Sequence, residues 1–125
     1  MTKKTFVIGI VLLLAVVALA REGKDVKLTG YVIDNRCAAS KANGENAAEN
    51  VKVHTVTCMM MPPCAKSGYA VFAGGKLYKL DEEGSKKAGD ILKNTKAEKG
   101  VQVSVEGTLD GDMLKVKSIS EVAGG

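Results

Sequence analysis

VQVSVEGTLDGDMLKVKSI, residues 101–119, is the stretch that decides the fold. Valine alternates with polar residues from Val101 to Glu106, and Asp110-Gly111 precedes a second β-rich run, Met113 to Ile119. An alternation with a period of two places one row of side chains on each face of a strand, and Asp-Gly is a typical hairpin turn. The stretch therefore predicts two antiparallel strands.

Three further strands are predicted upstream of this hairpin. Residues Val26 to Ile33 are rich in β-formers and are interrupted by Gly30, where a strand can bend sharply. Tyr69 to Phe72 and Leu77 to Leu80 flank the turn residues Gly74-Gly75, which is a second hairpin signal.

One helix is expected between the two hairpins. Gly84-Ser85 supplies a helix start. Ala88, Ile91 and Leu92 have the spacing of a single apolar helix face, and the helix should end before Gly100. The resulting order of elements is that of the five-stranded OB barrel. We therefore expect a mostly β fold: a small five-stranded OB-like barrel with one short helix between its third and fourth strands.

The first and second strands are separated by a long polar segment. Residues 37–50 are rich in Ala, Ser, Asn, Lys and Glu, include Gly44 and show no clean period. We expect a long loop there, with room for a helical turn. This loop belongs to an insertion of about 30 residues, 37–67, that carries the Cys and His residues.

The N-terminus has the layout of a secretory signal peptide, because Lys3 and Lys4 precede an apolar run from Phe6 to Ala20 that ends in small residues. The run is shorter than the roughly 20 residues that cross a bilayer as a helix. We expect residues 1–20 to be cleaved, leaving 21–125 as one domain exported to the periplasm or the extracellular space. An uncleaved anchor is the competing interpretation, and it would be the only contact with a membrane.

Composition argues against a nucleic-acid partner. The formal net charge is +4, and no basic stripe gathers the lysines into one patch. Aromatic residues make up 4% of the chain and tryptophan is absent, which disfavours a platform for stacking bases. The partner is expected to be an unknown protein or small ligand.

Four residues stand out for their chemistry, because Cys37, His54, Cys58 and Cys64 are the only cysteines and the only histidine in the chain. His54 and Cys58 are four residues apart, so they share a face in a helix and in a strand alike. Cys64 follows the stiff turn Pro62-Pro63, and Cys37 follows the first strand. Three cysteines with one histidine make a recognised tetrahedral zinc set, and we predict these four residues as metal ligands.

The identity of the metal depends on ligand softness. Met59, Met60 and Met61 follow Cys58, and thiolate with thioether ligands favours Cu(I), whereas three thiolates with one imidazole favour structural Zn(II). We favour a packing role for the methionines, in the core or on an adaptable apolar surface, because consecutive residues cannot all face one ion. The expected cofactor is therefore zinc or copper.

A disulfide is the main alternative to a metal. Exported thiols meet an oxidising environment, so two of the three cysteines would pair. A bridge from Cys37 to Cys58 or to Cys64 would tie the long loop to the barrel. Such a bridge would stabilise the domain by roughly 2–4 kcal/mol and leave one incidental thiol. The function would then be a disulfide-stabilised OB-like domain that binds a small ligand, a glycan or a protein.

Catalysis is a weaker interpretation. His54 and Cys58 could form a thiolate–imidazolium pair, but the sequence shows no third residue to orient the histidine. Asp34, Asp81, Glu82 and Glu83 are expected to be turn and surface carboxylates. We therefore expect a binding module and not an enzyme.

The chain resembles small exported OB-like proteins of bacteria. The matching segments are Thr29-Gly-Tyr-Val-Ile-Asp34 with Cys37, His54-Thr-Val-Thr-Cys58, Pro62-Pro63-Cys64 and Ser67-Gly68-Tyr69. They cover nearly the whole expected mature domain. The resemblance implies the OB-like fold and the Cys/His insertion. Because those proteins have no established activity, it implies no reaction and no ligand assignment.

Overall fold

The computed structural model describes residues 23–122. The predicted signal peptide, residues 1–20, lies outside this range. Among the helices of residues 23–122, none combines the length and the apolar character needed to cross a membrane.

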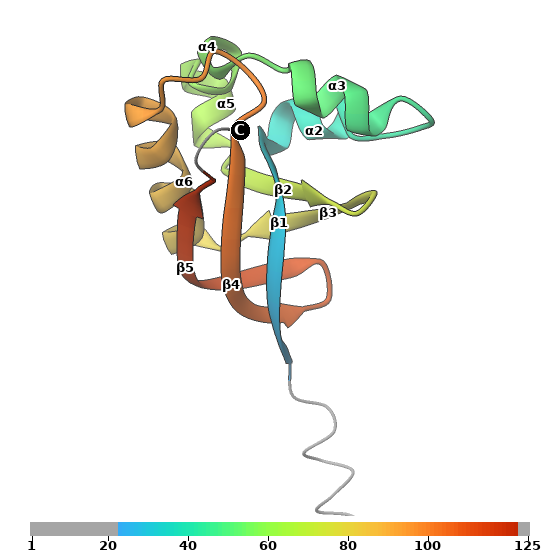
Figure 1. The fold of residues 1–125 in the computed structure, drawn as a ribbon, viewed down its shortest axis with the longest axis vertical. Helices are drawn as coiled ribbons and strands as arrows, with labels where there is room; N and C mark the ends of the chain where they lie inside the picture. The colour runs from blue at the N-terminus through green and yellow to red at the C-terminus, as the bar shows by residue number, and fades with distance from the viewer. Residues whose placement is uncertain (1–22, 123–125) are drawn as a thin grey trace, which may run out of the picture.

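Five strands close into a barrel in the order β1-β2-β3-β5-β4, as Figure 1 shows. This confirms the predicted mostly β, OB-like architecture. The strands are β1 (Lys24–Asp34), β2 (Tyr69–Ala73), β3 (Lys76–Leu80), β4 (Gln102–Asp110) and β5 (Met113–Glu121).

The long strand β1 joins the two hairpins. Its first part pairs with β4 and its last part pairs with β2, both antiparallel, and Tyr31 takes part in both ladders. Gly30 lies at this transition, where a Cβ atom would overlap the Phe72 carbonyl oxygen, so only glycine fits. A short parallel pairing, from Lys79 opposite Met113 to Leu80 opposite Leu114, closes the barrel.

The barrel interior is filled by the alternating residues that the sequence indicated. Val101, Val103 and Val105 are at most 1% exposed and pack in the main core. Helix α6 (Glu82–Asn94) covers one side of the barrel and buries Ala88 and Leu92 in the same core.

Helix α6 begins two residues before the predicted start at Gly84-Ser85. The reason is that Asp81 caps the helix: its Oδ1 accepts a hydrogen bond from the Gly84 amide at 3.0 Å. The sequence indicated Asp81 only as a turn or surface carboxylate. In the structure it is the N-cap of α6.

The prediction of a long loop after the first strand was wrong. This segment folds into four short helices, gathered at one end of the barrel (Figure 1). They are α2 (Asn35–Lys41), α3 (Ala47–Val53), α4 (Val56–Met59) and α5 (Pro62–Lys66).

Helices this short have no room for a visible apolar period, so local signals and tertiary packing produce them. Asp34 and Thr55 cap α2 and α4, and a proline begins α5. Ala38, Ala47 and Val51 pack with Ile33 and Phe72 in a second core beneath α2 and α3.

Candidate metal centre

The short helices bring all four predicted ligands to the end of β1. Cys37 lies in α2, His54 ends α3 as its C-cap, Cys58 lies in α4 and Cys64 lies in α5. All three cysteines are free thiols.

Cys37, His54 and Cys58 form one group that could hold a metal ion. Their ligand atoms, two Sγ atoms and one ring nitrogen, all lie within 4.8 Å of one another. Cys64 belongs to a second group: its Sγ lies within 4.8 Å of the Cys37 Sγ and of a carboxylate oxygen of Asp34. Cys37 is therefore shared, and the predicted set of four is arranged as two overlapping groups.

Asp34 is the site residue that the sequence analysis missed. It was expected at the surface, but it is completely buried. Its Oδ1 lies 3.0 Å from His54 Nε2, and its Oδ2 accepts a hydrogen bond from the Cys37 amide at 3.0 Å. The spacing Asp-x-x-Cys at a strand end is the signal that could have revealed it, because an N-cap aspartate accepts from the amide three residues later.

The contact with Asp34 selects one form of the His54 ring. An ionised carboxylate only accepts hydrogen bonds, so the contact favours the tautomer in which Nε2 donates to Asp34. In the neutral imidazole this leaves the lone pair on Nδ1 free for a metal. Metal-binding histidines commonly donate their second ring N–H to a carboxylate in this way.

The Cys37 and Cys64 thiols, which lie near Asp34, hold their protons tightly. Burial, followed by the hydrogen bond and the charge of Asp34, raises the pKa of Cys37 to about 12. Burial first and Asp34 second also raise the pKa of Cys64. Without a metal both thiols are therefore protonated at neutral pH, and a metal that binds Cys37 must displace its proton.

Tyr69 fixes the end of α4 against the barrel. Its hydroxyl donates a hydrogen bond to the Met59 carbonyl at 3.0 Å. Met59 is buried in the main core, whereas Met60 and Met61 are exposed at the surface. The methionine triplet thus divides between core and surface, in agreement with its favoured interpretation as packing residues.

A small cavity leads from the surface to the first group. Its volume is about 190 Å³, and His54 and Cys58 line it together with Lys41 and Asn50. Solvent, ions and small reagents can therefore reach the side of the site that Cys58 occupies.

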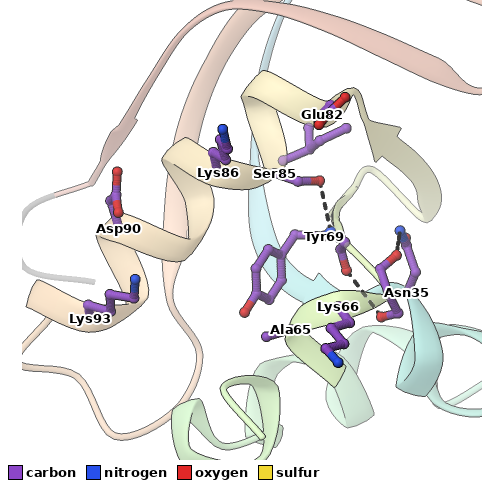
Figure 2. Close-up of a pocket in the computed structure, with 12 residues that line it drawn as sticks. Asn35, Ala65, Lys66, Tyr69, Glu82, Ser85, Lys86, Asp90 and Lys93 are labelled. Carbon is purple, nitrogen blue, oxygen red and sulfur yellow. Dashed lines mark hydrogen bonds between the residues drawn. The ribbon is translucent and has the colours of Figure 1, made fainter. Parts of the chain in front are cut away.

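A larger cavity of about 630 Å³ lies between α5, the start of β2 and α6 (Figure 2). None of the four predicted ligands lines it. Its lining combines cationic and anionic side chains, namely Lys66, Lys86, Lys93, Glu82 and Asp90.

The comparisons with known proteins are negative. No protein-family model, no curated protein and no solved structure matches this chain. The candidate site therefore stands on its own geometry.

Proposed function

We propose that this chain is an exported binding module that holds one transition-metal ion, preferentially zinc, through Cys37, His54 and Cys58. The observation that supports the proposal best is the buried contact between Asp34 and His54. It supplies the carboxylate partner that metal-binding histidines use, in a place where three ligand atoms already converge.

The ligand types favour a borderline or soft cation. Two thiolates with one imidazole suit zinc or copper and are poor ligands for magnesium or calcium. Zinc is preferred over Cu(I) because the core packing of Met59 and the exposure of Met60 and Met61 do not indicate a thioether ligand.

The spacing of the ligand atoms is compatible with zinc. Zn–S and Zn–N bonds of about 2.3 and 2.0 Å in a tetrahedron place neighbouring ligand atoms about 3.5–3.8 Å apart. The present separations of at most 4.8 Å therefore need a contraction of at most about 1.3 Å. Rotation of the two cysteine side chains, which are only partly buried, can supply it.

Such an ion would hold the short helices at the end of the barrel in contact with one another. Its ligands come from α2, the end of α3 and α4, which are separate short helices. Domains below about 70–80 residues commonly use a metal or a disulfide in this way, and the described residues 23–122 form a domain only somewhat larger.

The test is the metal content of the protein purified from the exported fraction. Native mass spectrometry and elemental analysis should find one ion per folded chain. His54→Ala and Cys58→Ser should lose it. Asp81→Ala is the control, because it removes the α6 cap, at a cost of about 1 kcal/mol, without touching the site. Full metal content in His54→Ala would refute the proposal.

Binding of a small polar ligand is the second candidate function. The cavity between α5 and α6 favours it, since about 630 Å³ lies in the usual range for ligand sites and three lysines there suit an anionic group. The same experiment separates the candidates. A folded wild-type protein that contains no metal, and takes up none when zinc is added, would leave this cavity as the better candidate.

A further inference from the structure

We propose that the metal site is controlled by oxidation: a disulfide between Cys37 and Cys64 removes Cys37 as a ligand and releases the ion. This inference rests on the proposed function and adds the regulation of the same site. It assigns Cys64, which the sequence indicated as a fourth ligand, the role of redox partner.

The shared position of Cys37 is the first reason. Its Sγ lies within 4.8 Å of the Cys58 Sγ in one group and within 4.8 Å of the Cys64 Sγ in the other. Cys37 can therefore serve the metal or pair with Cys64, and it cannot do both. The loss of one of two thiolate ligands would weaken the binding of the ion strongly.

The fixed placement of α2 against α5 is the second reason. The Asn35 side chain donates to the Ser67 carbonyl at 2.8 Å, a contact drawn in Figure 2, and the Asn35 amide donates to the Gly68 carbonyl at 2.9 Å. The Arg36 amide donates to Ser67 Oγ at 3.1 Å. These bonds hold the start of α2 beside the end of α5. The two sulfurs already lie within 4.8 Å of each other, and a disulfide requires them to approach to about 2.05 Å.

Burial is the third reason. Cys64 is only 7% exposed, whereas Cys37 and Cys58 are partly exposed. An external disulfide therefore reaches Cys37 more easily than Cys64. Once a mixed disulfide forms on Cys37, the neighbouring buried sulfur of Cys64 is well placed to resolve it.

The reaction balances with an external disulfide as the oxidant, for example oxidised glutathione. In the zinc-loaded protein Cys37 is a metal-bound thiolate. Its sulfur attacks the external disulfide, forms a mixed disulfide and expels one external thiolate. The Cys64 sulfur then attacks Cys37 and expels the second. Two electrons thus pass from the two cysteine sulfurs to the external disulfide, which leaves as two thiols. One departing thiolate takes the proton of Cys64, and the other takes a proton from the solvent. The ion leaves as a hydrated cation, and a dithiol reductant reverses the reaction.

The test uses the full mature chain loaded with zinc. Oxidised glutathione is added in the presence of a chromophoric zinc chelator, and zinc release is followed together with intact mass. Wild type should release zinc while the mass of the polypeptide falls by two hydrogen atoms. Peptide mapping should place the new disulfide between Cys37 and Cys64, and dithiothreitol should restore zinc binding. Cys64→Ser should bind zinc as wild type does. Its rate of zinc release should be lower than that of wild type by roughly tenfold or more.

The outcomes separate this inference from the proposed function. If Cys64→Ser binds no zinc before oxidation, Cys64 is a ligand and the inference is wrong, while the metal site stands. Release from Cys64→Ser at the wild-type rate, or a bridge from Cys37 to Cys58, also overturns the inference. If wild type itself binds no zinc, both proposals fail. Cys64→Ala, which keeps an apolar side chain in the buried position, replaces Cys64→Ser if circular dichroism shows that the serine variant does not fold.

Discussion

Asp34 occupies the position where a strand, a helix and the candidate metal centre meet. Its two oxygens serve different partners, since Oδ2 caps α2 through the Cys37 amide and Oδ1 holds the His54 ring. Burying a carboxylate costs free energy unless hydrogen bonds compensate for the lost water. The residue therefore makes most sense as a group that positions His54.

Asp34→Asn should lower zinc affinity by about 10–100-fold, the usual effect of losing the carboxylate behind a metal-binding histidine. The amide has the same shape but no charge to hold the ring N–H. Competition with a fluorescent chelator measures the affinity. Asp25→Asn is the matched control, because Asp25 is an exposed carboxylate that pairs with Lys117 far along the chain. An unchanged affinity in Asp34→Asn would mean that Asp34 acts only as a helix cap.

The helices differ in what makes them form. Helices α2 to α5 have between 4 and 7 residues, far below the roughly 12–15 at which isolated helices become stable in water. They depend on caps and on contacts with the barrel. Helix α6 has 13 residues and its own cap at Asp81, and Gly84 in its first turn lies directly against Val116 of β5.

Two glycines of α6 provide a matched test of this packing. Gly84→Ala should destabilise the protein by about 1–3 kcal/mol, because the added Cβ would overlap the Val116 side chain and the Asp81 cap. Gly89→Ala should stabilise it by about 0.5–1 kcal/mol, since its Cβ would make an ordinary contact of 3.5 Å with the Tyr69 ring. Urea unfolding measures both changes. A stabilising Gly84→Ala would show that α6 does not lie this close to β5.

Across the whole molecule, a continuous barrel supports a helical end layer. The main core fills the barrel, and a second, smaller core lies beneath α2 and α3. The barrel strands hold one another through ladders that run around the sheet. The end layer has only short helices, so a metal would contribute more to its stability than to that of the barrel.

Removal of the metal should therefore loosen one part of the molecule selectively. After zinc is removed with a chelator, the amides of α2, α3 and α4 should exchange with deuterium faster. Those of β4 and β5 should stay protected. Hydrogen exchange followed by mass spectrometry gives the measurement, and His54→Ala should show the same pattern without the chelator. Equal acceleration over the whole chain would contradict a local role for the ion.

The predictable parts of this protein were those with a repeating pattern or a strong turn signal. The alternation around Val103 and the turns at Gly74-Gly75 and Asp110-Gly111 led to the observed strands. The helices of the insertion were missed because none is long enough to display a period. The predicted signal peptide and export stay predictions, since residues 1–20 lie outside the described range.

By itself, the sequence determined the five strands, the turns of the two hairpins and the choice of residues for a cluster, because side-chain periodicity, turn residues and rare ligand types are local properties of the chain. Only the tertiary structure decided that Asp34 is buried beside His54 and that Cys37 is shared between two groups. The physical reason is that these contacts join residues distant in sequence. Their distances are set by how four short helices pack on the end of the barrel, which no local pattern encodes.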